Sequence, residues 1–200
     1  MAPRRRYLRM DETSRSRPAL QLRAAVHDDL AVFHAIDTDA GMLFEQAGLL
    51  LDLPDDHEFS LTERTRWARS IAAGNALLAL DARGTATGFA ALGERDGQPF
   101  LQQLSVRQAS MRQGIGTMLL EAMLLAASRA GAAALWLTTY DHLPWNRPFY
   151  ERSGFMRVKE SDCGPELRQD LEYERRWLPQ PEHRIAMCRL LPRVAGGSHP

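Results

Sequence analysis

The fold is decided by one short stretch, Met111-Arg-Gln-Gly-Ile-Gly-Thr117, which lies between an apolar run at 100–106 and a helical pattern at 117–130. A strand, a Gly-x-Gly turn and a helix in this order are typical of a phosphate-binding site. Glycines allow a close backbone approach, and the first helical turn has unpaired N–H groups. The helix dipole adds about half a positive charge at this end. An ordinary turn before a helix is the alternative interpretation of Gly114 and Gly116.

Two common phosphate motifs do not fit this stretch. The dinucleotide fingerprint requires a third small residue where Leu119 stands, and a Walker loop requires Gly-Lys-Ser/Thr. The pattern therefore predicts a pyrophosphate-binding turn of another kind.

The residues that follow the next apolar run, at 133–139, indicate which kind of pyrophosphate-binding turn this is. The combined pattern resembles the GNAT acetyltransferase superfamily, whose pyrophosphate motif is Gln/Arg-x-x-Gly-x-Gly/Ala. In that family an Asn further on leads into a short helix with Phe-Tyr-x-x-x-Gly-Phe. The matching residues here are Asn146, Phe149, Tyr150, Gly154 and Phe155. Met111 departs from the first motif, which the family tolerates because its phosphate contacts are mainly backbone amides.

The resemblance implies an α+β fold with a mixed, mostly antiparallel sheet that is splayed between its fourth and fifth strands and flanked by helices. Hydrophobic periodicity in the first half agrees with this. It predicts a strand at 20–25, helices starting at Asp28 or Asp29, at Gly41 and at a Ser60–Glu63 capping box, and strands at 76–80, 85–93 and 100–106.

The second half predicts the remaining elements. Helix 117–130 is expected to bury Met118, Leu119, Ala122, Met123 and Ala126. A strand at 133–139 and a short helix at 148–153 follow. Strands at 155–158 and 185–191 are expected to pair around a charged, proline-rich insert at 162–182. The domain is predicted to span 19–193, with disordered tails at 1–18 and 194–200; Met10 is an alternative start to Met1.

The resemblance also implies that acetyl-CoA is the cosubstrate. Its pantetheine would pair with the open edge of the fourth strand, in the manner of an added strand. The residues implied for binding are Leu104, Ser105, Val106, Arg112, Gln113, Gly114, Ile115, Gly116, Thr117, Asn146 and Phe149. Asn146 could instead cap the helix that begins near Pro148, and Arg112 could be a solvated side chain.

The expected chemistry is direct attack of an amine on the thioester. Tyr150 is the candidate acid toward the CoA sulfur, and a core aromatic is its alternative role. Two carboxylates that relatives use as bases are missing, since Thr138 and Phe100 stand at those positions. Glu94 is the leading candidate for the base. Glu45, Asp141, His142 and a water relay remain open, as does an apolar acceptor pocket formed by Met42, Phe44 and Trp145.

Composition excludes several classes of protein. The 200-residue chain has a net charge of zero and two cysteines without Cys-x-x-Cys spacing. We expect one cytoplasmic domain with reduced thiols, no nucleic-acid partner and no membrane span. No metal is expected, because neither Asp141-His142 nor 55–58 is matched by a second spaced ligand pair. The oligomeric state, including a homodimer, stays open.

The sequence therefore predicts an N-acetyltransferase that moves an acetyl group from acetyl-CoA to a primary amine of a small molecule or peptide. The alternative is an acyl-CoA-binding regulatory module of the same fold that does not catalyse transfer. A relative that acetylates aminoacyl-tRNA would require a basic face, which the neutral charge disfavours. The acceptor cannot be named from the sequence.

Overall fold

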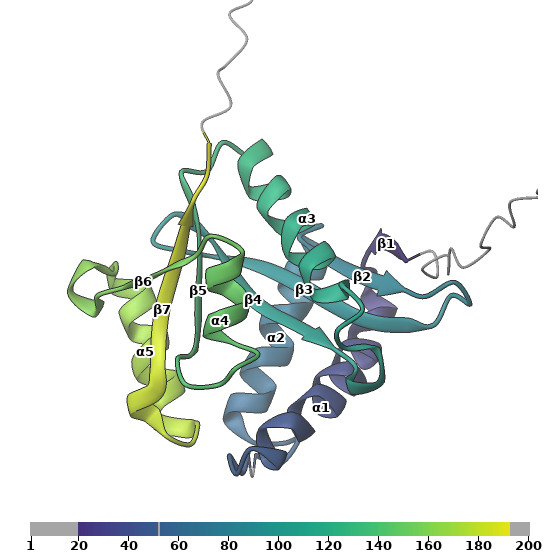
Figure 1. Cartoon of the computed structure of the whole chain (residues 1–200), viewed down its shortest axis with the longest axis horizontal. Coiled ribbons are helices and arrows are strands. Elements are labelled where there is room, and N and C mark those ends of the chain that lie inside the picture. Colours follow the sequence, from purple (N-terminus) through teal and green to yellow (C-terminus); the bar gives the residue numbers. More distant parts are fainter. Residues whose placement is uncertain (1–19, 52, 193–200) are drawn as a thin grey trace, which may run out of the picture.

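A seven-stranded sheet forms the centre of the molecule, in the order β1-β2-β3-β4-β5-β7-β6 (Figure 1). The computed structural model describes residues 20–51 and 53–192. All neighbouring strands are antiparallel except β4 and β5. The strands are β1 (Gln21–Ala24), β2 (Ala76–Leu80), β3 (Ala86–Arg95), β4 (Gln98–Val106), β5 (Ala134–Tyr140), β6 (Met156–Val158) and β7 (Arg184–Leu190).

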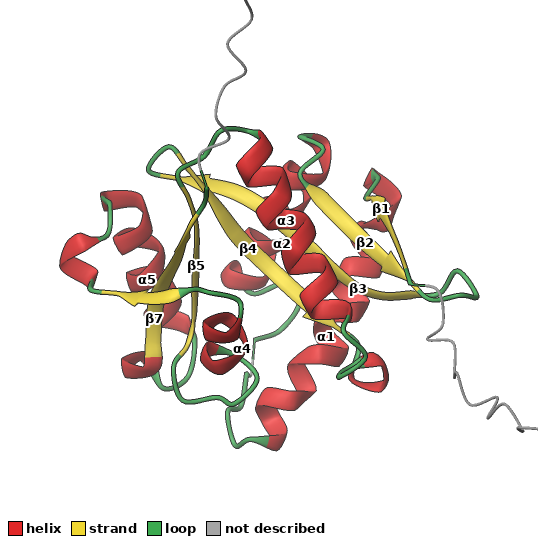
Figure 2. Cartoon of the chain, turned by 45° about the horizontal axis from the view of Figure 1, so that its top comes forward, coloured by secondary structure: helices red, strands yellow, loops and turns green. Residues whose placement is uncertain are grey.

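Helices cover both faces of this sheet. α3 (Ile115–Arg129) and α4 (Arg147–Arg152) pack on one face, where α3 contributes much of the largest apolar core. α1 (Leu30–Gln46) and α2 (Glu58–Ala72) cover the other face of β2 and β3 with a second core. α5 (Pro165–Trp177) packs over β7 on that same side, as the two views show (Figures 1 and 2).

The sheet splits between β4 and β5. Their parallel pairing consists of one residue pair, Phe100 and Trp136, and beyond it the two strands diverge (Figure 2). A β-bulge contributes to the split: Ala91 and Leu92 of β3 pair with Gln103 and Leu101, which leaves Gln102 as an extra residue in β4. The second half of β4 is therefore open toward β5, as expected for a sheet splayed between its fourth and fifth strands.

The strands agree closely with the sequence prediction, whereas the three helices expected between residues 28 and 74 differ from it. The helices expected to start near residue 29 and at Gly41 are one continuous helix, α1. Gly41 does not interrupt it, because a single glycine costs a helix only about 1 kcal/mol relative to alanine. α2 begins at Glu58, so Ser60 lies inside the helix and the predicted capping box is wrong; His57 is the N-cap.

The buried face of α3 is also rotated from the predicted one. Leu119 and Met123 are buried as expected, but Met118 and Ala122 are half-buried and Ala126 is exposed. The rotation follows from the position of Ile115, which begins the helix and packs over Gly88 of β3. The fully buried residues are Ile115, Leu119, Leu120, Met123, Leu124 and Ala127.

The insert at 162–182 contains α5, a helix absent from the sequence prediction. Pro165 occupies the first turn, where proline is well tolerated, and Leu167 and Leu171 lie buried against Phe100 and Ala186. The predicted tails and the expected domain ends at 19 and 193 fall outside the described residues. Within the described residues, no helix has the length and apolar character needed to cross a lipid bilayer.

Candidate active site

The turn between β4 and α3 has the geometry of an anion site. Arg112 and Gly114 have positive φ values of 62° and 87°, and Gly114 is the N-cap of α3. This arrangement turns the chain so that the amides of 112–117 meet no acceptor: among the described residues, none of these N–H groups donates a hydrogen bond to the protein. Six free amides at the positive end of a helix can bind a phosphate or pyrophosphate.

The segment just before this turn is fixed from the opposite face of the sheet. Asp39 of α1 accepts a hydrogen bond from the Gln108 backbone N–H at 2.6 Å, and its carbonyl accepts one from the Gln108 side chain at 2.7 Å. The turn is therefore positioned by α1 as well as by α3 and β4, which preorganises its amides.

Three predicted binding residues meet beside the turn. A Cβ placed on Gly116 would lie 3.6 Å from Leu104 Cδ2 and 3.6 Å from Phe149 Cζ. These are ordinary contacts, and the φ of Gly116 is not positive, so the protein itself does not require glycine there. Gly114 is different, because its positive φ strains any other residue. Open β4, the helix N-terminus and α4 thus converge at Gly116.

The side chains of the remaining strand residues are engaged within the protein. Ser105 is buried on the other side of β4, where its hydroxyl donates a 2.7 Å hydrogen bond to Asp37 of α1. Val106 is part of the core beneath α3. Both residues can contact a ligand along β4 only through their backbone, as predicted for an added strand.

Asn146 and Tyr150 present polar groups that the protein leaves free. Asn146 is the N-cap of α4, yet its side chain makes no capping hydrogen bond; its backbone carbonyl accepts from Phe149 and Tyr150 instead. The half-buried Tyr150 ring packs edge-on against Phe149 and Phe155, and its hydroxyl has no hydrogen-bond partner among the described residues. Burial raises the pKa of Tyr150 to about 12, an effect that the charge of Arg184 opposes. The phenol is therefore protonated at neutral pH.

A second set of polar side chains lies on the α2–α5 side of the split in the sheet. Thr138 of β5 donates to Glu174 of α5 at 2.6 Å, and Arg184 of β7 forms a 2.7 Å ion pair with the same carboxylate. Thr138 stands where the resemblance implied a missing carboxylate, so α5 supplies one from a segment that the sequence analysis read as an insert. Thr138 and Glu174 are 36 positions apart in the sequence, so no local signal predicts this contact.

Glu63 of α2 belongs to the same region and is the most perturbed carboxyl group there. Burial raises its pKa to about 7; Arg66, which bonds it at 2.8 Å, lowers the pKa, and the charges of Glu174 and Asp170 raise it further. A buried carboxyl that titrates near neutral pH is suited to accept a proton.

Glu94 lies at the wrong end of the sheet for the role predicted from the sequence. It is exposed beside the β3–β4 turn and pairs with Pro99, whereas the Gly-x-Gly turn follows Val106. Seven residues of strand separate Pro99 from Val106, which corresponds to about 23 Å. Glu94 is therefore not brought together with the other site residues.

The predicted apolar pocket is only partly formed. Phe44 and Trp145 pack edge to face with ring centroids 6.0 Å apart, next to Tyr140 and Leu143, while Met42 is 49% exposed. The buried Nε1 of Trp145 has no partner among the described residues.

Of the other candidate bases, Glu45 is exposed, and His142 contacts Asp141 and His183.

Comparisons with known proteins agree with this geometry. Residues 73–157 match the model of the acetyltransferase (GNAT) domain. An acetyltransferase of the GNAT family from Staphylococcus aureus has a TM-score of 0.64 at 16% identity, with 87% of this chain and 100% of that chain covered. N-acetylglutamate synthase from Neisseria gonorrhoeae, complexed with coenzyme A and N-acetyl-glutamate, has a TM-score of 0.64 at 19% identity and 88% coverage of this chain.

The chain spans 36% of the length of that synthase. The ribosomal-protein-S18-alanine N-acetyltransferase from Escherichia coli is similar over its whole length, with a TM-score of 0.58, 16% identity and 91% of this chain covered. Residues 73–157 thus match the acetyltransferase (GNAT) domain, and the fold of the described chain is similar to that of solved acetyltransferases of this family.

Proposed function

We propose that this protein is an N-acetyltransferase that transfers the acetyl group of acetyl-CoA to a primary amine of a small molecule or peptide. The observation that carries the proposal is the row of free amides at 112–117, placed beside the unpaired half of β4. The amides offer the pyrophosphate of CoA its hydrogen bonds, and the open strand offers its pantetheine a backbone to pair with.

The residues around this row support the same orientation of CoA. The pantetheine would pass Leu104, Ser105 and Val106, with Phe149 and the free side chain of Asn146 on its other side. A groove of about 420 Å³ continues from Thr117 along α3 and is lined by Arg152 and Arg189. These arginines suit the phosphorylated nucleotide end of CoA. Arg112 adds a further positive charge at the turn.

The transfer needs two proton movements. The amine nitrogen bonds to the thioester carbon, and the carbon–sulfur bond then breaks as the tetrahedral intermediate collapses. Tyr150, protonated at neutral pH, would donate its proton to the departing thiolate and recover one from solvent.

The amine must also lose a proton, because an alkylammonium group with a pKa near 10 is less than about 1% free amine at pH 7. We propose Glu63 as the group that receives this proton, directly or through water, and give Glu94 no part in it. Glu63 lies on the α2–α5 side, with the Thr138, Glu174 and Arg184 group, opposite the α3 and α4 face. The amine would therefore enter from one side of the split sheet and CoA from the other.

The cellular compartment that we propose follows from the state of the cysteines. The two cysteines, Cys163 and Cys188, are free and buried, which suits a reducing compartment such as the cytoplasm. Acetyl-CoA would be met there as a free cosubstrate.

Acetyl-CoA turnover with a panel of amino acids, polyamines and peptides tests the proposal. We expect acceptor-dependent release of free CoA, detected with a thiol reagent, and an acetylated amine of the matching mass. Tight binding of acetyl-CoA with no turnover on any amine class would instead support the non-catalytic regulatory module.

A further inference from the structure

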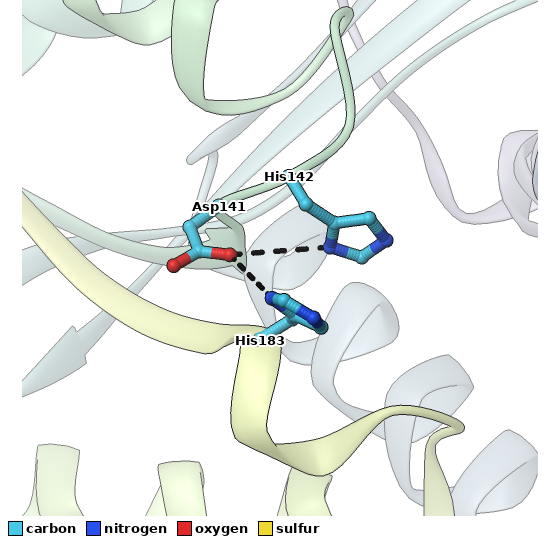
Figure 3. Close-up of side chains that lie close together, drawn as sticks. All are labelled: Asp141, His142 and His183. Carbon is cyan, nitrogen blue, oxygen red and sulfur yellow. Dashed lines mark hydrogen bonds and ion pairs between the residues drawn. The ribbon is translucent and has the colours of Figure 1, made fainter.

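Three metal-ligating side chains meet at the end of β5, outside the residues assigned to acetyl transfer (Figure 3). Asp141 and His142 directly follow β5, and His183 directly precedes β7. The ligand atoms of all three lie within 4.8 Å of one another. The sequence alone predicts no metal because Asp141-His142 has no partner pair; the fold supplies His183, 41 residues downstream of His142.

The scaffold that holds these residues is rigid. Tyr140 and Arg184 are paired in the β5–β7 ladder, and the Asp141 backbone N–H donates to the His183 carbonyl at 3.0 Å. Both chain segments are therefore fixed by backbone hydrogen bonds at the point where the side chains leave them. A ligand set on paired strand ends needs little ordering when an ion binds.

The spacing suits one first-row metal ion. His183 Nδ1 lies 2.8 Å from Asp141 Oδ1, and His142 Nδ1 lies 3.9 Å from the same oxygen. Two ligands of one tetrahedral ion, each bound at about 2.1 Å, are roughly 3.4 Å apart. These two distances fall on either side of this value and no pair of ligand atoms is more than 4.8 Å apart, so side-chain shifts of roughly an ångström would seat an ion.

The surroundings hold the carboxylate without blocking it. Arg157 Nη1 contacts the other oxygen, Asp141 Oδ2, at 3.3 Å, and Glu182 lies 3.9 Å from His183 Nε2. One cation and one anion therefore flank the three ligands. The two imidazole rings are tilted by 45° with their centroids 4.1 Å apart, so both lie close enough to share one ion.

We propose that Asp141, His142 and His183 bind a divalent transition-metal ion of the zinc type, joining the end of β5 to the start of β7. Two imidazole nitrogens and one carboxylate oxygen form a donor set that such ions prefer over the oxygen-only sets chosen by Mg²⁺ and Ca²⁺. Three protein ligands leave a fourth position for water. The site is independent of the proposed acetyl transfer.

Calorimetric titration of the metal-free full chain with Zn²⁺ tests the site, with Co²⁺ absorption as a report on coordination. We expect one bound ion per chain, a higher thermal unfolding midpoint and a visible Co²⁺ band of tetrahedral intensity. Because imidazole binds a metal only when neutral, affinity should fall as the pH is lowered from 7.5 to 5.5.

Variants separate this site from adventitious binding. His142→Ala and His183→Ala should each weaken Zn²⁺ binding at least about 10-fold, the effect expected for losing a ligand or its support. His27→Ala, which changes a histidine outside the cluster, should leave it unchanged. Equal binding by wild type and both cluster variants would overturn the site, as would an absence of Zn²⁺ binding or an equal response to Mg²⁺.

Discussion

At the scale of single residues, Asn146 has two candidate roles: a structural role as a helix cap and a functional role as a ligand contact. Its position before Pro148 predicts a helix cap equally well as a ligand contact. The structure removes the first alternative, because the side chain makes no capping bond and its backbone alone closes the turn. A position in sequence can thus suggest a ligand-contacting residue, and its hydrogen-bond partners show whether the side chain is free for that role.

Glu63 and Glu94 show the opposite case. The sequence favours Glu94 because its strand neighbours the strand expected to bind CoA, yet the β3–β4 turn places Glu94 at the far end of that strand. Glu63 belongs to no motif, since its raised pKa comes first from burial and then from the charges of Glu174 and Asp170 of α5, while Arg66 of its own helix lowers it. Long-range contacts of this kind leave no pattern in one sequence.

Tyr150→Phe tests the proposed acid. We expect kcat to fall about 10- to 1000-fold while the Kd of acetyl-CoA changes little, because the ring packing is kept and only the proton donor is lost. Steady-state kinetics and calorimetry on the same preparation give both values. An unchanged kcat would assign Tyr150 to packing alone.

Glu63→Gln tests the proposed base through the pH dependence of the rate. A carboxyl with a pKa of about 7 is mostly protonated below that pH and ionised above it, so kcat/KM should rise through pH 7 in the wild type. In Glu63→Gln the rise should be lost and the rate at pH 8 should fall at least about 10-fold.

Glu94→Gln is the matched control, since it makes the same chemical change at the exposed end of β3. It should keep the wild-type pH profile. The assignment fails if Glu94→Gln flattens the profile and Glu63→Gln does not.

At the scale of elements, strands and hairpins were predicted well because their signals are local. Alternating apolar residues and the turns at 81–84 and 95–97 define β2, β3 and β4 within a few residues. Helix boundaries were harder. The sequence predicts a helix start at Gly41, which lies inside α1, and an insert at 162–182, where Pro165 begins α5. In α5 the packing of Leu167 and Leu171 favours the helix, whereas at Gly41 the helix continues because one glycine costs it little.

α5 is attached to the rest of the fold through Asp170. This buried carboxylate bonds Arg66 of α2 at 2.7 Å and Arg95 of β3 at 2.5 Å. Asp170→Ala leaves two partly buried guanidinium groups without their anion, so we expect a loss of about 3 kcal/mol in the free energy of unfolding. Denaturant titration measures it.

The exposed pair Arg147–Glu151 has the same 2.7 Å separation and provides the comparison. Glu151→Ala should leave the unfolding midpoint unchanged within error, because water screens that pair. If the two variants cost the same, burial does not give the Asp170 contacts their strength.

At the scale of the whole molecule, the split sheet explains how the parts of the site cooperate. β4 and β5 share one residue pair, and beyond it the two strands diverge, so the split has an α3–α4 side and an α2–α5 side. The α3–α4 side presents free amides and aromatic rings, which suit a nucleotide thioester. The α2–α5 side presents carboxylates and arginines, which suit a polar amine. A direct transfer requires both ligands at once, and this architecture admits both.

The most direct test of this account is calorimetric titration of acetyl-CoA into the wild type, Gly116→Ala and Gly116→Val. We predict a micromolar Kd for the wild type, about −7 to −8 kcal/mol. Alanine should be tolerated, since its Cβ would meet Leu104 and Phe149 at 3.6 Å, whereas the branched valine should obstruct the ligand beside the amides. A folded Gly116→Val protein that binds acetyl-CoA as tightly as the wild type would contradict the assignment of 112–117 as the pyrophosphate site.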